Sequence, residues 1–390
     1  MSLDWLIIGG GIHGVHIAAK LLGEAQVEPS GLRIVDPGER LLERWRTCTA
    51  TTGMTHLRSP SVHNLDLNPW SLFRYAGKRK TRKPGLFAPP YDRPQLGFFN
   101  DHCDKVIDEF KLDDLHVCAD ATTCAVDCEG VTVGLSTGEF IQTQNVVLAI
   151  GAGGQPEWPA WARRDDPRIH HIFAKTFDGW PTRRETVAVV GGGISAGQVA
   201  LRLIDEGHEV HLISRHPLRE HQFDSEPGWL GPKYMAGFER EQNLERRREM
   251  IAEARHKGSV PPDVHRSLRI AIDRNQARWF EGEVESVDTD GPTLNLKLTT
   301  GDAVEANRLL LATGFTSTRP GGKLIDQLVE SESLPCASCG YPVVDKALRW
   351  HPRVYVSGPL AELELGPSSR NISGARRAAE RLVVAARAMA

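Results

Sequence analysis

The chain of 390 residues lacks long apolar runs, a strong net charge and a cysteine framework. No run approaches the ~20 apolar residues that a membrane-spanning helix needs, so no membrane partner is expected. The net charge of −3 gives no general attraction for nucleic acid. Seven scattered cysteines, and the absence of a leader before the first apolar strand, predict a cytoplasmic location.

Signatures of acid–base and metal chemistry are also missing. No Ser-His-Asp or H-E-x-x-H pattern stands out along the chain. Cys336 and Cys339 form a C-A-S-C pair, which is a structural pair, a redox disulfide or half of a zinc site. A second pair of ligands at suitable spacing is not visible, so no metal site is expected.

The first apolar run occupies residues 6–8, and a glycine-rich loop follows it. Its fingerprint positions are Gly9, Gly11 and Gly14. The first glycine permits a tight turn, the second lets a pyrophosphate approach the backbone, and the third lets the next helix pack closely. Asp36 ends the following strand, where a carboxylate accepts hydrogen bonds from an adenosine ribose. The sequence therefore predicts a dinucleotide site here.

A second loop of this type, VVGGGISAGQ, occupies residues 189–198. Gly191, Gly193 and Ala196 hold the three fingerprint positions. The next strand leads to Arg215 rather than to a carboxylate, and an arginine at this point suits the 2′-phosphate of NADP. The alternative is that Arg215 is a solvated loop charge. Two loops predict two nucleotides.

An internal repeat supports this duplication. Residues 128–151 and 290–314 each read as a strand, a Thr-Gly turn, a return strand and an apolar strand that ends in a glycine. The two final glycines are Gly151 and Gly314. A repeat of this length indicates two related modules.

Three further segments carry a family resemblance. LATGF at 311–315, the segment at 43–78 beginning ERWRTC, and PPYDRPQLGFFNDHCDKV at 89–106 are similar to segments of class B flavin monooxygenases. With the two loops, the chain most resembles the lysine and ornithine N-hydroxylating members, over nearly its whole length. The resemblance implies an α/β fold with two Rossmann-like three-layer domains, the NADPH domain being inserted into the FAD domain.

On this resemblance the domains divide the chain in order. Residues 1–160 form the first part of the FAD domain, 165–310 form the NADPH domain, and 311–390 return to the FAD domain. Segment 221–262 is a variable part of the NADPH domain, either a lid or a surface insertion with a small core of its own. Within it, residues 239–255 are predicted to form one helix with a solvated charged face.

The resemblance also implies the chemistry. NADPH would reduce FAD, O₂ would form a flavin C4a-hydroperoxide, and a nitrogen or sulfur atom of a small amine or thioether would be oxygenated. Gly151, Gly314 and Gly358 are further cofactor-binding candidates. The flavin-lining candidates are Trp45, Met54, His56, Arg58, Ser59 and Asn371.

One departure keeps other functions open. Ala174 stands where the family carries a histidine, although His170 and His171 lie just upstream. An FAD/NADPH reductase that passes electrons to a disulfide or another acceptor is therefore an alternative, as is a flavin-binding redox sensor without turnover. The sequence predicts neither the substrate, nor the flavin affinity, nor the oligomeric state.

Overall fold

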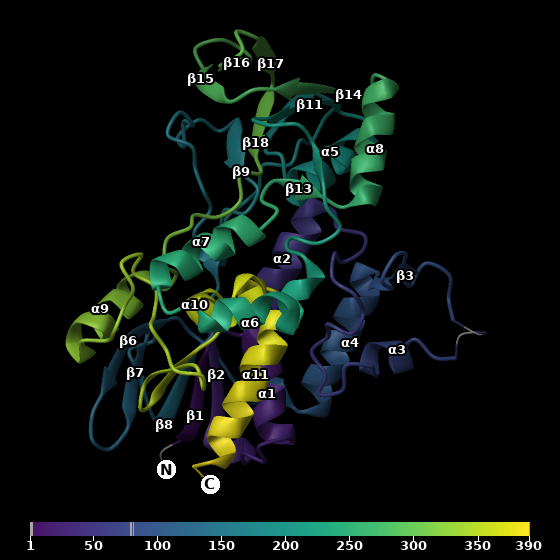
Figure 1. Cartoon of the computed structure of the whole chain (residues 1–390). Helices are drawn as coiled ribbons and strands as arrows, with labels where there is room; N and C mark the ends of the chain where they lie inside the picture. The colour runs from purple at the N-terminus through teal and green to yellow at the C-terminus, as the bar shows by residue number, and fades with distance from the viewer. Residues whose placement is uncertain (1–2, 79, 81, 390) are drawn as a thin grey trace.

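The computed structural model describes residues 3–78, 80 and 82–389, and it contains two mainly parallel sheets with separate helices (Figure 1). This confirms the predicted α/β class. The first sheet has the order β19-β20-β8-β1-β2-β5, with β6 and β7 attached through β8. Its strands are β1 (Leu3–Ile8), β2 (Leu32–Asp36), β5 (His116–Cys118), β6 (Ala121–Val126), β7 (Val131–Leu135), β8 (Phe140–Leu148), β19 (Arg349–His351) and β20 (Val354–Val356).

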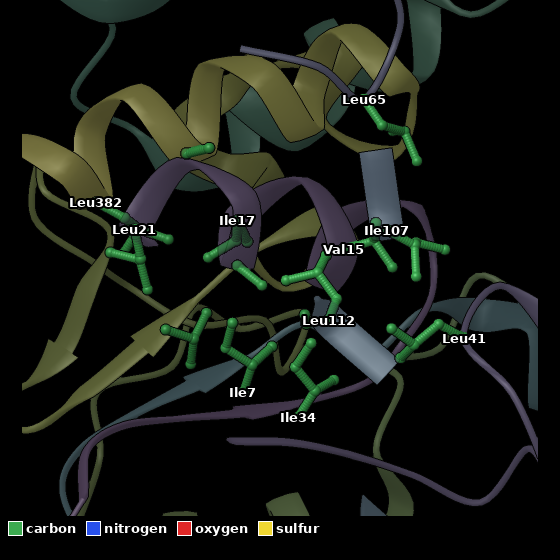
Figure 2. Packing of buried hydrophobic residues seen from close by; sticks show 14 of the residues in the cluster. Ile7, Val15, Ile17, Leu21, Ile34, Leu41, Leu65, Ile107, Leu112 and Leu382 are labelled. Atoms are coloured by element: carbon green, nitrogen blue, oxygen red, sulfur yellow. The ribbon is translucent and has the colours of Figure 1, made fainter. Parts of the chain in front are cut away.

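Alternating side chains of β1 divide the first core into two layers. Trp5 and Ile7 face α1 (Ile12–Gly23) and α11 (Ile372–Arg387), whereas Leu6 and Ile8 face the opposite cluster. This follows from the two-residue period of a strand buried on both faces. Figure 2 shows Ile7 and Ile34 of the sheet below α1, with Leu382 of α11 above. The remaining helices here are α2 (Glu43–Thr52), α3 (Ser71–Tyr75), α4 (Leu96–Glu109), α9 (Gly322–Glu332) and α10 (Glu362–Leu365).

The second sheet is wholly parallel, in the order β14-β11-β10-β18-β9. All its strands fall between β8 and β19 in the chain, as an inserted unit requires. The domain boundaries proposed from the sequence remain a prediction. The strands are β9 (Ile169–His171), β10 (Thr186–Val190), β11 (Glu209–Ser214), β14 (Ala277–Glu281) and β18 (Arg308–Leu311), with α5 (Ile194–Asp205) and α8 (Pro262–Asp273) packed on them.

The sequence repeat corresponds to matching hairpins. Gly138 and Gly301 both take positive φ, +88° and +93°, and donate to Leu135 and Leu298. One difference separates the modules. In the first, the return strand and the apolar strand are the single strand β8. In the second, they are β17 (Ala303–Ala306) and β18, and β17 joins a separate sheet with β15 (Val284–Asp288) and β16 (Leu294–Leu298).

The inserted segment differs from its prediction. Residues 239–255 do not form one helix, because α6 (Pro232–Arg240) ends and α7 (Leu244–Ala254) begins anew. The break has a local cause: the side chain of Asn243 accepts a hydrogen bond from the amide of Arg246 and so caps α7. The charged face is not fully solvated either, since Arg247 and Arg248 bind residues of α10.

Short elements complete the description. The hairpin of β3 (Phe87–Ala88) and β4 (Arg93–Pro94) precedes α4, and β12 (Arg219–Glu220) pairs with β13 (Ser259–Val260). Single turns η5 (Pro227–Leu230) and η7 (Pro367–Arg370) precede α6 and α11. No helix among the described residues is long and apolar enough to cross a membrane.

Candidate cofactor sites

The first glycine loop has the geometry that its sequence predicts. Gly9 has φ +114°, and a Cβ there would lie 2.5 Å from the carbonyl oxygen of Ala149. A Cβ on Gly14 would lie 1.8 Å from the carbonyl oxygen of Gly9. Gly11, by contrast, has no atom within 4 Å of its Cβ position. The outer two glycines are therefore required by the loop itself, and the middle one faces open space.

The start of α1 leaves donors free beside that space. Gly11 is the N-cap of α1 and supplies no side chain to bind the first amides. Such amides and the helix dipole suit an anion. Asp36 holds the loop in place: its carboxylate accepts from the amide of Gly10 at 2.7 Å and from that of Gly38 at 2.9 Å. A carboxylate offers about four acceptor positions, so capacity remains for a ribose.

The second loop repeats this arrangement. Gly191 has φ +154°, and its Cβ would lie 2.5 Å from the carbonyl oxygen of Ala312. The nearest atom to a Cβ on Gly193 is the Cα of Gly258, at 3.7 Å. Ala196 is buried at the third position. Gly193 is an N-cap without a side chain, so the start of α5 also offers free amides.

Arg215 lies just beyond β11 and is exposed. It forms no hydrogen bond or ion pair with any residue that the structure describes, which leaves its guanidinium available to a phosphate. His216, the next residue, lies against Gly192 of the loop, whose Cβ position is 2.8 Å from the imidazole. The arrangement favours the NADP interpretation over that of an incidental loop charge, and the role of Arg215 stays a prediction.

Residues 357–358 of the return segment, which is residues 311–390, lie beside the first glycine-rich loop. Gly358 has φ +65°, and its Cβ position is 3.7 Å from the ring of His13. The Nδ1 atom of His13 is 2.8 Å from the hydroxyl of Ser357. Burial lowers the pKa of His13 to about 4, so the ring is neutral at pH 7. Sequence reasoning missed His13, although it stands inside the fingerprint loop.

The other two predicted glycines lie at the ends of their modules. Gly314 has φ +85° and nothing within 4 Å of its Cβ position. The nearest atom to a Cβ on Gly151 is 3.9 Å away. Both positions therefore leave backbone open, as close approach of a cofactor requires.

Two of the predicted flavin-lining residues bind the inserted segment. Arg58 donates to the backbone carbonyls of His221, Gln222 and Phe223 at 2.6–2.8 Å. The side chain of Asn371, at the N-cap of α11, donates to Asp224 at 3.1 Å. The guanidinium of Arg58 is thus engaged by protein acceptors, which favours a positioning role. Asn371 does not cap α11, so the first amides of α11 remain free.

The remaining lining candidates are spread over α2 and the segment after it. Trp45 donates from Nε1 to Asn100 at 3.1 Å. Met54 packs against the first core, and His56 contacts the carbonyl of Gly85 at 3.0 Å. Ser59 is half-buried next to Arg58. Their roles toward a flavin stay predictions.

Near Ala174, a histidine occupies a defined position. His171 is buried, and burial lowers its pKa to about 4. Its Nδ1 accepts from the amide of Phe173 at 3.1 Å, and its Nε2 lies 3.1 Å from the hydroxyl of Thr313. That hydroxyl donates to the carbonyl of Glu157, so Nε2 of a neutral ring must carry the proton. His171 therefore contacts the LATGF segment directly.

Comparison with known proteins agrees with this geometry. Residues 6–153 match a family model described as FAD-NAD(P)-binding. Residues 92–257 match one described as pyridine nucleotide-disulphide oxidoreductase. Together these matches include both glycine-rich loops. No curated protein matches the chain by sequence.

Solved structures extend the likeness to the whole chain. The ornithine hydroxylase of Pseudomonas aeruginosa superposes with a TM-score of 0.79 at 18% identity, covering 100% of this chain and 99% of its own. The ornithine N-hydroxylase of Kutzneria sp. 744, solved with reduced FAD, NADP⁺ and L-ornithine, gives 0.79 at 17% identity with 100% coverage of both chains. The bacillithiol disulfide reductase of Bacillus cereus gives 0.65 at 15%, with 100% coverage of both.

The fold class follows from these superpositions. The protein has the fold of flavoproteins with two dinucleotide-binding domains. Within that class, its fold is the one found in the N-hydroxylating flavin monooxygenases, as the sequence resemblance predicts. The same fold also serves a disulfide reductase, so fold alone does not select the reaction.

Proposed function

We propose that the protein is an FAD- and NADPH-dependent monooxygenase that hydroxylates a nitrogen of a small-molecule amine. The observation that carries the proposal is the pair of matching glycine-rich loops beside uncapped helix starts, in which a Cβ on Gly11 meets no atom within 4 Å and a Cβ on Gly193 meets none closer than 3.7 Å. The full-length likeness to ornithine N-hydroxylases supports the choice of reaction. The proposal includes the sulfur of a thioether as the alternative acceptor atom, and a cytoplasmic location.

The residues of the chain fit the two cofactors. Gly9, Gly11 and Gly14 with Asp36 would hold FAD, and Gly191 and Gly193 with Ala196 and Arg215 would hold NADPH. When bound, a flavin reduced by NADPH activates O₂ and delivers one oxygen atom to a nucleophilic substrate atom.

The protein then supplies charge and position. The free amides at the start of α11 would stabilise negative charge on the reduced flavin. His171, neutral and held by Thr313, adds no positive charge of its own near the LATGF segment.

Coupling between NADPH use and product formation tests the proposal. The flavin-loaded protein is incubated with NADPH, O₂ and single amines, including ornithine, lysine and cadaverine. Hydroxylamine product, NADPH consumed and H₂O₂ released are measured together. A monooxygenase gives close to one product per NADPH with its substrate and releases peroxide without it. NADPH oxidation that yields only peroxide with every amine and thioether would contradict the proposal.

A reductase is the second candidate, because Cys336 and Cys339 are both exposed and unpaired, and Sγ of Cys339 lies 3.5 Å from Arg248. One feature opposes it: although Cys336 is exposed, desolvation by the protein atoms around it raises the pKa of its thiol, which lowers its thiolate fraction. A reductase would reduce a low-molecular-weight disulfide under nitrogen, and the Cys336→Ser, Cys339→Ser double variant would not.

A further inference from the structure

Two histidines and a glutamate meet at the base of the inserted segment. His221 and His256 stack face to face, with ring centroids 3.7 Å apart and planes within 4°. The Nε2 atom of His256 is 3.3 Å from a carboxylate oxygen of Glu226. One ligand atom from each residue lies within 4.8 Å of the other two, and the group is the only such trio among the described residues.

We propose that His221, Glu226 and His256 form a binding site for a divalent transition-metal ion of the zinc type, which clips together the two ends of the inserted segment. Two imidazoles and one carboxylate are a donor set that zinc takes in proteins, with the fourth position left to water. Nothing in this inference depends on the proposed flavin chemistry.

The distance between two of the three ligand atoms agrees with such a centre. Ligand atoms about 2.0–2.1 Å from a tetrahedral ion lie roughly 3.3 Å from each other. His256 and Glu226 already have this separation. The ring of His221 has to rotate, because two cofacial imidazoles cannot both direct in-plane lone pairs at one ion.

The backbone around the trio is already fixed. The amide of His256 donates to the carbonyl of Asp224 at 2.8 Å, and that of His221 donates to Val260 at 3.0 Å. Arg58 holds the carbonyl of His221 from the other side. These bonds bring residues 221–226 and 255–260 together without a metal, so binding needs side-chain adjustment only.

A metal at this place would close a long loop. The trio joins the residues just before η5 and α6 to the second residue after the end of α7. A metal ion that joins the two ends of the segment lowers the conformational entropy of states in which the segment is detached, and so favours the attached state. The cationic side chain of Arg58 next to His221 opposes a divalent ion, so titration is a better test than retention through purification.

Calorimetric titration of the untagged, flavin-loaded protein with Zn²⁺ in chelator-free buffer provides the test. We expect one ion per chain. His221→Ala and His256→Ala should each weaken binding by about tenfold or more. His265→Ala is the matched control, because among the described residues the side chain of His265 pairs with Glu220 alone, at 3.1 Å, and is absent from the trio. Zinc binding unchanged in the His256→Ala variant would overturn the proposal.

Two further measurements distinguish the trio from the thiols as the source of the ligands. The Cys336→Ser, Cys339→Ser double variant should bind zinc normally, and loss of binding there would assign the ion to the thiols instead. X-ray absorption at the zinc edge should show nitrogen and oxygen ligands, and sulfur ligands would refute the assignment. Glu226→Gln, at an exposed position, keeps the side-chain size and should also weaken binding, which preserves the test if His256→Ala disturbs folding.

Discussion

Replacing Gly11 by alanine should weaken FAD binding without harming the fold. In the structure a Cβ at Gly11 meets no atom within 4 Å, and the residue has φ −79°, which alanine adopts freely. We therefore expect the free energy of unfolding of the apoprotein to change by no more than about 0.5 kcal/mol. Gly14→Ala should instead lower the free energy of unfolding of the apoprotein, since its Cβ would lie 1.8 Å from the carbonyl oxygen of Gly9.

The loss of affinity follows from the bonds that the extra methyl group prevents. A hydrogen bond to a charged group contributes about 1.5–3 kcal/mol. If the methyl group displaces the pyrophosphate from one amide of the loop, the dissociation constant for FAD rises roughly 10- to 100-fold. Gly193→Ala should act in the same way on the KM for NADPH and leave FAD binding intact.

Fluorescence titration of the apoprotein with FAD, together with denaturant unfolding, measures both quantities. Gly237→Ala is the matched control, because Gly237 is exposed on α6 and its Cβ position is equally open. An unchanged FAD affinity in Gly11→Ala would refute the assignment of this loop to the pyrophosphate. Equal losses of stability in Gly11→Ala and Gly14→Ala would refute the distinction between the two glycines.

Three other outcomes follow from the same structure. Arg215→Ala should lower kcat/KM for NADPH about tenfold or more and leave that for NADH unchanged, which steady-state kinetics with both coenzymes will show. Glu362→Gln should destabilise the protein by about 3–5 kcal/mol in urea unfolding, because the carboxylate is 1% exposed and neutralises Arg370 and Arg248. Neutral, partly buried His13 and buried His16, with pKa values lowered to about 4 and about 3, should each contribute roughly 2 kcal/mol to stability at pH 7 that is lost on acidification to pH 5, because the unfolded chain takes up their protons first.

The carboxylate of Glu362 adds a second, separate acid dependence. Burial alone would raise its pKa, but the guanidinium groups of Arg370 and Arg248 overcome this and lower it. A lowered carboxyl pKa stabilises the folded state above the unfolded value, and this stabilisation is lost as the pH falls further. Acid unfolding followed in Glu362→Gln should therefore be shallower at low pH than in the parent protein.

The two glycine-rich loops could be predicted from local sequence, because their fingerprint residues contact near neighbours in the chain. Gly14 must be small because Gly9 lies five positions before it on the same loop, and this relation is visible in sequence. The sequence repeat could be recognised for the same reason. In each hairpin the turn glycine follows, by three residues, the leucine whose carbonyl accepts its hydrogen bond. The α/β class and the strand order of each loop unit follow from these local rules.

Contacts between distant segments were not predictable in this way. Arg58 was predicted to line the flavin from its neighbours in the chain, and its hydrogen bonds to residues 221–223 and to Ser259 were not foreseen. The helix break at Asn243 was missed because a strongly charged helical pattern outweighed a single capping residue. His221 and His256 belong to no sequence motif, and the pairing of β12 with β13, with the hydrogen bond from the amide of His256 to the carbonyl of Asp224, brings them together.

The inserted segment connects the two halves of the molecule through its ends and its middle. Arg58 and Asn371, both predicted to line the flavin, bind its first residues, and Met235 and Phe238 of α6 share a small core with Tyr341 of the return segment. A simple surface insertion would bury its apolar side chains among themselves, whereas this core is shared with another part of the chain. Displacing α6 and α7 would therefore disturb contacts on the flavin side as well as those of the NADPH side, which makes the segment a bridge between the two predicted cofactor sites.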